Sequence, residues 1–291
     1  MYNFSDTIPT NRQEELKNKI LQNFEAKINP KKYAFWEIRN SDFTATFYNS
    51  SKFVIQGRGT KKLMAALGLS LETANNPDGY EIITVPHIGT DESGKGDFFG
   101  PLVIAGVYVN DEIRKYFHNL LIKDSKTLKD HRIKRLALEI QKSTCFSVVS
   151  ISNKKYNELY NRFNNLNRLL AWGHATVIEN ILEKTACEMA VSDKFGSDGL
   201  IINALKTRGQ KITLEQRVRG ESDIAVAAAS VLARATFIKK LEDMQNFYGL
   251  EFSKGCNQSV IAQANAFIKK YGKNRLNEVC KTHFKTFNEI L

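Results

Sequence analysis

Two adjacent acidic residues, Asp91 and Glu92, stand where an apolar run gives way to a glycine-rich turn. The segment from His87 to Val109 reads HIGTDESGKGDFFGPLVIAGVYV, with β-like runs on both sides of the turn. Successive side chains of a strand diverge, so two acids at a strand end can offer separate oxygen ligands to hard divalent cations. Such cations activate water and stabilise the leaving oxygen in phosphodiester hydrolysis. The pair therefore indicates a metal site for that chemistry.

Two other interpretations fit part of this segment. A polar hairpin tip would also place acids beside glycines, and the pattern alone does not exclude it. Gly89-x-x-x-x-Gly94-Lys95 nearly matches the P-loop pattern, but Gly96 stands where a Ser or Thr should bind magnesium. The acidic pair would also repel phosphates, and the run after the turn is β-like, so no helix N-terminus follows. We therefore do not expect a P-loop.

A metal site needs further carboxylates from elsewhere in the chain. Asp193 ends the segment KTACEMAVSD and is expected on or just after a short strand. Glu221 and Asp223 lie in RGESD, directly before the run AVAAASVLARA. On pattern alone, turn and helix-capping roles are equally compatible with these acids. The small residues of that run predict a helix that approaches a sheet or another helix closely, which would bring its N-terminal acids near the strand ends.

The first part of the chain predicts a small α+β domain over residues 1–75. Apolar spacing predicts a helix over residues 10–28, and a second helix over residues 61–74. Between them, β-like runs begin at Tyr33, Phe43 and Lys52, with turn-rich separators that favour an antiparallel meander. The cluster NNPDG makes residues 76–80 the expected linker.

Residues 81–291 are expected to form the main domain. Two strands flank the glycine-rich turn, a helix is predicted over residues 130–142, and CFSVVSIS is a predicted strand. Residues 156–190 are predicted to be largely helical, and a long helix is predicted over residues 223–244, with more helix in the last 35 residues. This mixture predicts an α/β domain.

The composition indicates which kinds of partner and which cellular location to expect. The 291 residues include 42 Lys and Arg against 31 Asp and Glu, a net charge of +11, which favours a polyanionic partner. No two of the four cysteines are spaced as a metal knuckle or redox pair, so reduced thiols are expected. The chain shows neither a signal-peptide pattern nor an apolar run that could span a bilayer. We expect a cytoplasmic protein with no membrane partner, and a monomer.

Taken together, these segments resemble a type 2 ribonuclease H, specifically ribonuclease HIII. The resemblance rests on the strand–DESGKGD–strand unit, in which the central Gly94-Lys95-Gly96 has the lysine of the HIII branch rather than the arginine of the HII branch. Asp124-Ser125-Lys126 resembles the family's DSK motif, and RGES before AVAAASVLAR resembles its fourth-carboxylate segment. WGHA at residues 172–175 is also similar to HIII sequences. The match covers roughly residues 81–291.

The resemblance implies an endoribonuclease that hydrolyses the RNA strand of RNA–DNA hybrids by two-metal-ion catalysis, leaving 5′-phosphate and 3′-hydroxyl ends. It implies Asp91, Glu92 and Asp193 as ligands of Mg²⁺ or Mn²⁺, and Glu221 as the fourth catalytic carboxylate, with Asp223 as the alternate. The implied substrate-binding residues are Ser93, Gly94, Lys95, Gly96, Ser125 and Lys126. For His174 we expect a helix-interior histidine with a local partner rather than a catalytic residue.

The resemblance also implies a ribonuclease H-like mixed sheet flanked by helices, preceded by a domain similar to the TATA-binding-protein fold that helps to bind substrate. Basic and aromatic residues that could contact phosphates there are Lys31, Lys32, Trp36, Lys52, Arg58, Lys61 and Lys62. A solvated surface charge is the simpler interpretation of any single lysine. A non-catalytic nucleic-acid-binding protein and another two-metal phosphodiesterase remain the alternatives.

Overall fold

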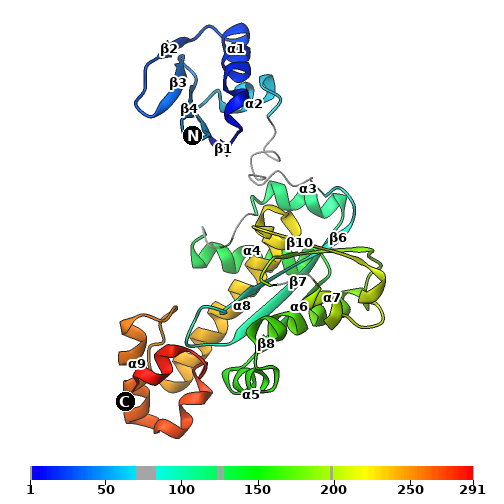
Figure 1. The fold of residues 1–291 in the computed structure, drawn as a ribbon, viewed down its shortest axis with the longest axis vertical. Coiled ribbons are helices and arrows are strands. Elements are labelled where there is room, and N and C mark those ends of the chain that lie inside the picture. Colours follow the sequence, from blue (N-terminus) through cyan, green and yellow to red (C-terminus); the bar gives the residue numbers. More distant parts are fainter. Residues whose placement is uncertain (1, 70–82, 123–124, 126–127, 197–198, 291) are drawn as a thin grey trace. The chain divides into compact units, whose positions relative to one another are not determined.

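The computed structural model describes residues 2–69, 83–122, 125, 128–196 and 199–290. The chain divides into two compact units, Met1–Ile82 and Ile83–Leu291 (Figure 1). The linker predicted at residues 76–80 lies outside the described residues. No helix within the described ranges is long and apolar enough to cross a membrane.

The N-terminal unit is built on one five-stranded antiparallel sheet. Its strands, in spatial order, are β1 (Tyr2–Thr7), β5 (Lys52–Gly57), β4 (Thr44–Tyr48), β3 (Ala34–Arg39) and β2 (Lys27–Asn29). The predicted meander is confirmed, because β3 pairs with β4 and β4 with β5, both antiparallel. The edge strands β1 and β2 were not predicted.

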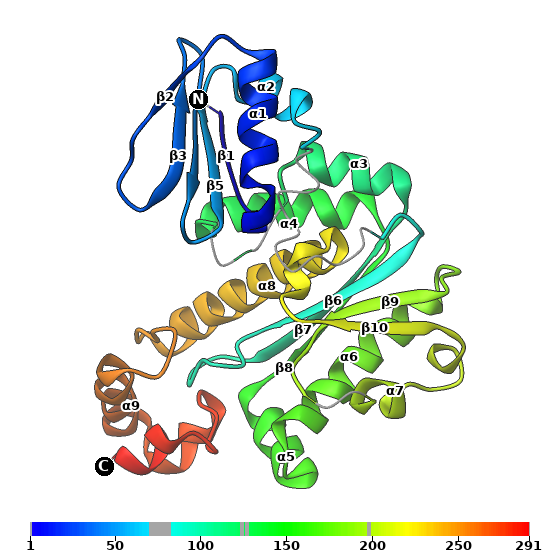
Figure 2. The same ribbon diagram turned by 45° about the horizontal axis from the view of Figure 1, so that its top comes forward.

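Two helices pack on this sheet, α1 (Gln13–Asn23), which follows a 3-10 turn at Thr10–Arg12, and α2 (Thr60–Ala66) (Figure 2). Leu16 of α1 and Leu63 of α2 join strand residues such as Trp36 in one buried core. The prediction of a helix as far as residue 28 is wrong. Helix α1 ends at Asn23, and Ile28 instead pairs with β3, since the edge of the sheet offers it a ladder of main-chain partners.

The second unit contains a mixed five-stranded sheet. Its spatial order is β10 (Thr213–Arg217), β9 (Met189–Asp193), β6 (His87–Ser93), β7 (Leu102–Val109) and β8 (Phe146–Ile151). Strands β10, β9 and β6 run parallel, whereas β6, β7 and β8 form an antiparallel series. The predicted α/β class with a mixed sheet is confirmed.

Helices cover both faces of this sheet (Figure 2). The helices are α3 (Asp111–Asn119), α4 (Asp130–Ser143), α5 (Asn153–Phe163), α6 (Leu166–Leu182), α7 (Leu200–Ala204), α8 (Ile224–Tyr248) and α9 (Gln258–Tyr271). Short 3-10 turns follow α9 at Lys273–Glu278 and Lys285–Glu289. Alternate residues of β7 face opposite cores: Val103 packs in the core of α8, and Ile104 in the core that contains α6 residues.

Helix α8 packs closely on the strand that bears the acidic pair, as its small residues predict. A Cβ atom added to Gly89 of β6 would lie 2.1 Å from the main-chain carbon of Ala225, so only glycine fits at this crossing. Ala225 and the alanines that follow it are buried against the sheet. The close approach fixes the start of α8, and the acids before it, beside the sheet.

Candidate active site

The carboxyl ends of the three parallel strands meet at one edge of the sheet, which is where open α/β sheets bind their ligands. Asp91 and Glu92 lie near the end of β6, and Asp193 is the last residue of β9. Because Thr90 pairs with Ser192, the register sets Asp91 beside Asp193 on neighbouring strands. The hairpin interpretation is half right: β6 and β7 form a hairpin, but Asp91 and Glu92 pair with β7 within the strand and not at its tip.

The two adjacent acids are supported from opposite faces of the sheet. Asp91 accepts a hydrogen bond from the hydroxyl of Ser230 on α8. Glu92 Oε2 lies 3.2 Å from Nε2 of His174 on α6. Successive strand side chains alternate between faces, so each acid meets a different helix.

The carboxylate of Glu92 has a donor on each oxygen. Lys95 Nζ lies 3.3 Å from Oε1, opposite the contact that His174 makes with Oε2. Burial opposes ionisation of Glu92, but the hydrogen bonds and charges of His174 and Lys95 outweigh it and lower the pKa. Glu92 is therefore held as a carboxylate.

Asp91 is in the opposite electrostatic situation. Burial and the neighbouring charge of Glu92 raise its pKa well above the usual range, and the charge of Asp193 adds to the effect. The hydrogen bond from Ser230 and the amide of Glu92, which lies 2.8 Å from Asp91 Oδ1, offset only part of this. The donors around Asp91 thus stabilise its ionised form less than burial and the neighbouring charges oppose it.

The turn that bears Glu221 packs against Asp193 at the end of β9. The amide of Gly220 donates to Asp193 Oδ1 at 3.0 Å, and a Cβ at Gly220 would lie 2.9 Å from the Asp193 main chain. Glu221 follows in the 3-10 turn Gly220–Ser222 and is partly exposed. The turn therefore sets Glu221 beside the end of β9.

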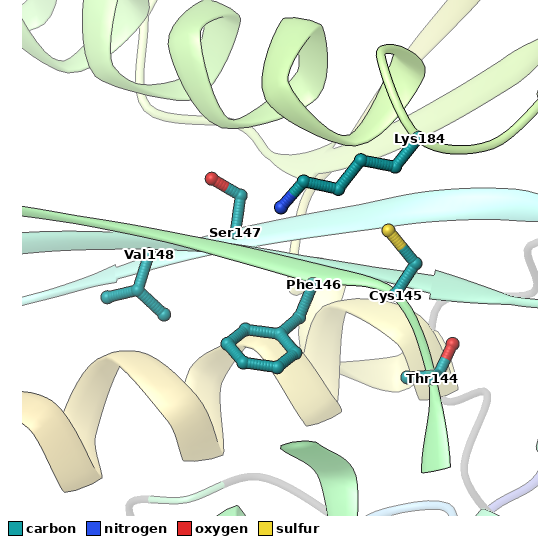
Figure 3. Close-up of a pocket in the computed structure, with 6 residues that line it drawn as sticks. All are labelled: Thr144, Cys145, Phe146, Ser147, Val148 and Lys184. Atoms are coloured by element: carbon teal, nitrogen blue, oxygen red, sulfur yellow. The ribbon is translucent and has the colours of Figure 1, made fainter. Parts of the chain in front are cut away.

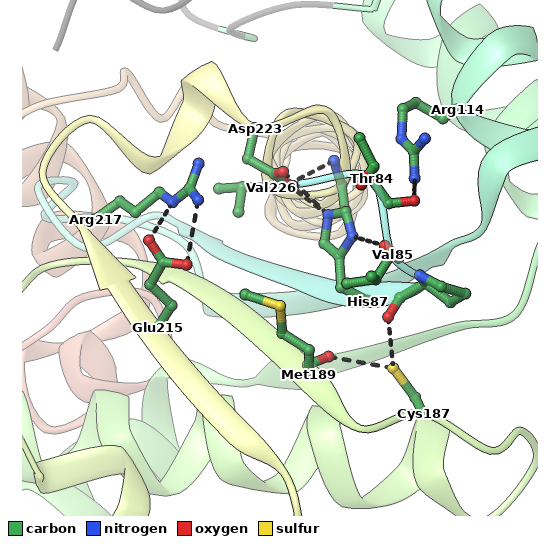
Figure 4. A network of polar contacts seen from close by, with 12 residues as sticks. Thr84, Val85, His87, Arg114, Cys187, Met189, Glu215, Arg217, Asp223 and Val226 are labelled. Atoms are coloured by element: carbon green, nitrogen blue, oxygen red, sulfur yellow. Dashed lines mark hydrogen bonds and ion pairs between the residues drawn. The ribbon is translucent and has the colours of Figure 1, made fainter. Parts of the chain in front are cut away.

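Asp223 has a different environment, although it is only two residues further on. Its Oδ1 accepts from the amides of Ala225 and Val226, which caps α8, and its Oδ2 lies 3.0 Å from Nε2 of His87 (Figure 4). His87 Nδ1 in turn contacts the carbonyl of Val85 at 2.9 Å. Asp223 is thus fully engaged in holding the start of α8, and both of its oxygens are occupied.

The glycine turn after β6 combines a fixed end and an open end. Gly94 has φ +86°, and a Cβ there would lie 2.2 Å from the Pro101 carbonyl oxygen, so glycine is required by the fold. A Cβ at Gly96 would meet nothing within 4 Å among the described atoms. The side chain of Lys95 reaches back to Glu92 and lies 5.7 Å from the centre of the Phe195 ring. Ser93 is the last residue of β6.

Ser125 is buried and faces inward. Its hydroxyl lies 2.7 Å from that of Ser230, and its carbonyl accepts a hydrogen bond from Arg234. Ser230 therefore contacts both the Ser125 hydroxyl and the Asp91 carboxyl. The side chain of Ser125 thus links to the acidic pair, and Lys126 lies outside the described residues.

The donor set fits hard divalent cations. Among the described side chains, no group of three or more carboxylate, His or Cys residues already surrounds one point as metal ligands. However, burial and then the charges of Glu92 and Asp193 raise the pKa of Asp91, and a bound cation would stabilise its ionised form. Carboxylate oxygens are the ligands that Mg²⁺ and Mn²⁺ prefer.

A cavity of about 430 Å³ lies elsewhere, along the edge strand β8 (Figure 3). It is lined by Thr144, Cys145, Phe146, Ser147, Val148 and Lys184. None of the predicted site residues lines it, and strand β7 separates β8 from the strand that bears the acidic pair. This cavity is separate from the acidic site.

Two residues that support the site were missed or underrated at the level of sequence. His174 was expected to have a local partner, but it bridges Thr90 Oγ1 at 2.8 Å and Glu92. Ser230 was expected only to be one small residue of a packing helix. A polar residue within a buried helical run is the signal that could have singled out Ser230, because buried hydroxyls need partners.

Comparisons with known protein sequences all find ribonucleases of one group. The family model described as Ribonuclease HII matches residues 88–287. Ribonuclease HIII of Chlamydia felis is 42% identical over 262 residues, covering 89% of this chain and 87% of the relative. Ribonuclease HIII of Chlamydia pneumoniae is 39% identical over 298 residues, covering 99% and 97%.

Solved structures agree in fold. The crystal structure of Bst-RNase HIII in complex with Mn²⁺ matches with a TM-score of 0.70 and 24% identity, covering 99% of this chain and 97% of that one. Ribonuclease H2 from Pyrococcus horikoshii matches with a TM-score of 0.62 and 21% identity, covering 70% and 96%. The fold is therefore ribonuclease H-like, and the sequence relatives show that this chain belongs to the ribonuclease HIII family.

Proposed function

We propose that this protein is an endoribonuclease that cleaves the RNA strand of RNA–DNA hybrids, with Asp91, Glu92, Asp193 and Glu221 as its catalytic carboxylates. The observation that carries the proposal is that Asp91 and Asp193 lie side by side on neighbouring strands, with the main chain of the turn before α8 bonded to Asp193. Family membership supports the reaction class.

We assign Asp91, Glu92 and Asp193 as the residues that hold two divalent cations, Mg²⁺ or Mn²⁺. Bound cations would supply an activated water and stabilise the leaving oxygen, so that cleavage leaves 5′-phosphate and 3′-hydroxyl ends. The similar Bst-RNase HIII was crystallised in complex with Mn²⁺, which supports the choice of metal.

The chain's own residues prepare this site. His174 orients Glu92 through Oε2 and leaves Oε1, now contacted by Lys95, to face a cation. Nε2 carries a proton when it donates to Glu92, and Nδ1 of the same ring meets the Thr90 hydroxyl at 2.8 Å. We assign the fourth carboxylate to Glu221 rather than Asp223, because the oxygens of Asp223 are taken by α8 and His87.

The glycine turn is proposed to bind the nucleic-acid backbone through Ser93, Gly94, Lys95 and Gly96. The open space at Gly96 lets a ribose approach the main chain closely, and a 2′-hydroxyl is what distinguishes RNA from DNA. On metal binding, Lys95 would be free to leave Glu92 for a phosphate. Ser125 is proposed to act through Ser230, with Lys126 as the phosphate contact of that motif.

The N-terminal unit is proposed to help bind substrate through the polar face of its sheet, which its two helices do not cover. On β5, exposed Lys52 and Gln56 alternate with buried Phe53 and Ile55. Gln56 pairs with Thr44, whose hydroxyl accepts from Arg39. Lysine and arginine on such a face would add salt-dependent phosphate contacts. The monomeric state and the cytoplasmic location stay predictions.

The decisive experiment uses a panel of RNA–DNA hybrid, single-stranded RNA, RNA duplex and DNA duplex, with Mg²⁺ or Mn²⁺ present. The wild type is expected to cut the RNA of the hybrid, and Asp91→Asn to lose cleavage while hybrid binding survives. Asp111→Asn, an exposed acid on α3, is the matched control and should cut normally.

Other outcomes identify the alternatives. Binding of hybrid without cation-dependent cleavage would indicate a non-catalytic binding protein. Cleavage of the DNA duplex at least as fast as the hybrid would indicate another phosphodiesterase. Cleavage by Asp91→Asn at a near wild-type rate would overturn the assignment of the site.

A further inference from the structure

A lysine far from the acidic pair in sequence is completely buried beside the glycine turn. Lys281 has no exposed surface, and its Nζ donates to the main-chain oxygens of Asp97 and Gly100, both at 2.7 Å. The carbonyl of Gly100 also accepts from Asn153 Nδ2 at 2.8 Å. The lysine therefore spans the segment that leads from the glycine turn into β7.

The same segment is already tied down by its main chain. The amide of Lys281 donates to Phe98 O at 2.9 Å, the amide of Gly100 donates to Val279 O at 3.2 Å, and Phe99 pairs with Cys280. Main-chain pairing thus holds the two segments together without help from an ammonium group. The Lys281 side chain additionally fixes the positions of the Asp97 and Gly100 carbonyls.

Burying this ammonium is costly. Within the described residues Lys281 has no ion pair with a carboxylate, and the groups that face it are the Asp97 carboxylate, Cys280, His283 and the Tyr156 ring, whose centre lies 5.6 Å from Nζ. Burial lowers the pKa of Lys281 to about 7. A neutral amine retains two donors, so both carbonyls stay bonded in either protonation state.

We propose that Lys281 is a positioning residue for the reaction, which holds residues 94–100 so that Lys95 and Gly96 meet the nucleic-acid backbone. The inference rests on the proposed function, because it assigns a role in binding that substrate. Lys281 itself does not touch the substrate; it acts through the turn.

The geometry shows how the lysine acts on the turn. At one end Gly94 is fixed by its packing against Pro101 and the Phe237 ring. At the other end Asp97 is held three times: its amide donates to Gly94 O at 3.3 Å, its Oδ1 accepts from Gly255 N at 2.6 Å, and its carbonyl accepts from Lys281. Lys95 and Gly96 lie between these two anchors and face open space at Gly96.

The test compares Lys281→Met, which retains the volume but no donor, with the wild type in the full-length chain. We expect KM for the RNA–DNA hybrid to rise roughly tenfold with little change in kcat, the scale of one lost charge-assisted hydrogen bond. In an Asp91→Asn background, the ratio of hybrid affinity to DNA-duplex affinity should also fall, since a loosened turn reads the 2′-hydroxyl less well. Lys285→Met, an exposed lysine nearby, is the matched control and should change neither.

A merely structural lysine gives a different result. It would lower the melting temperature and the active fraction, so that kcat falls while KM and the hybrid preference stay at wild-type values; that result overturns the proposal. If the Met variant does not fold, Lys281→Gln, whose shorter side chain ends in an amide NH2 that can still donate, takes its place and should show a smaller rise in KM. A wild type that does not cut hybrids overturns the proposed function as well, whereas a normal wild type with an unaffected variant overturns only the role of Lys281.

A double-mutant cycle tests whether the effect passes through the turn. Asp97→Ala removes the acceptor for the Gly255 amide and should raise KM in the same direction. Because both substitutions release the same end of the turn, their combined effect on KM should be smaller than the product of the single effects. A fully multiplicative result would mean that Lys281 acts by another route.

Discussion

His174 of α6 contacts Glu92 of β6, with its Nε2 3.2 Å from Glu92 Oε2. The ring is completely buried, and its centre lies 4.9 Å from that of Phe195, with the two rings tilted by 31°. Partners of this kind orient a metal-binding carboxylate, and their loss typically weakens metal binding by about 10–100-fold. Glu92 thus depends on a residue that does not itself meet the substrate.

The first prediction concerns this pair. His174→Phe, which keeps a buried ring but no donor, should weaken Mn²⁺ binding measured by calorimetry by roughly tenfold or more and lower kcat/KM on hybrid by a similar factor. His174→Gln, which can still donate to Glu92, should recover part of both. His118→Phe on α3 serves as control, and equal losses in all three variants would contradict the assignment.

A second prediction follows from the hydroxyl chain Ser125–Ser230–Asp91. Ser230→Ala removes a donor to Asp91 and leaves the buried Ser125 hydroxyl without its Ser230 partner, so the free energy of unfolding should fall by about 1–3 kcal/mol. The rate of hybrid cleavage should fall as well. Chemical denaturation and cleavage assays measure the two effects.

Ser147→Ala is the matched control for Ser230, because Ser147 is also buried and bonded, at 3.1 Å, to Asn180. It should cost stability without a change in the specific activity of folded protein. If Ser230→Ala behaves in the same way, the hydroxyl chain has no catalytic role.

The third prediction separates the two acids before α8. Glu221→Gln should lower kcat by orders of magnitude with little change in melting temperature, because its carboxylate forms no cap. Asp223→Asn should mainly lower stability, since it loses the charge that pairs with His87. The opposite pattern would make Asp223 the fourth carboxylate.

The fourth prediction is a pH dependence of stability from the His87–Asp223 pair. Burial opposes the charge on His87, but Asp223 outweighs it and raises the pKa above 6.5. Burial also opposes the charge on Asp223, but His87 and the amides of α8 lower its pKa below 3.8. The charge of Arg114 lowers the pKa of His87, but the net shift of that pKa is still upward.

The directions of the two pKa shifts define the pH range in which the pair stabilises the fold. The contribution of His87 is complete below about pH 6.5 and is lost as the pH rises through the raised pKa, whereas that of Asp223 is complete above about pH 3.8 and is lost as the pH falls. His87→Gln should therefore cost most stability near pH 5, on the order of 3 kcal/mol for a buried pair, and less above neutral pH. Urea denaturation at several pH values measures it, and a cost that does not vary with pH would refute the pair.

The sequence was informative where local patterns carry the structure. The strand–turn–strand around Asp91 and the helix of small residues are local, and both were predicted. Helix α3 and strand β10 were not: DEIRKYFHN is largely polar, and TLEQR has too few apolar residues to indicate a strand. Strand β10 forms because β9 offers it a parallel partner, which is a tertiary effect.

The supports of the site were harder to predict than its acids. Lys281 and His174 are set by packing between elements far apart in the chain, and neither has a spacing that points to Asp97 or Glu92. The carboxylates lie in recognisable sequence motifs. Each supporting contact depends instead on which distant side chain the fold brings against the carboxylate or the glycine turn. Sequence alone therefore predicted the candidate carboxylates but not the contacts that support them.

The pairing of β6 with β9, and the crossing of α8 at Gly89, also have a consequence for synthesis of the chain. Asp91 and Glu92 leave the ribosome well before Asp193, and Gly89 can be covered only after Ala225 has followed. Non-local parallel pairing is slow to form because a long loop must close first. If the proposed site is correct, a chain that ends before Asp193 holds only half of it, and hydrolytic activity would report that translation has passed α8 and that the whole sheet has assembled.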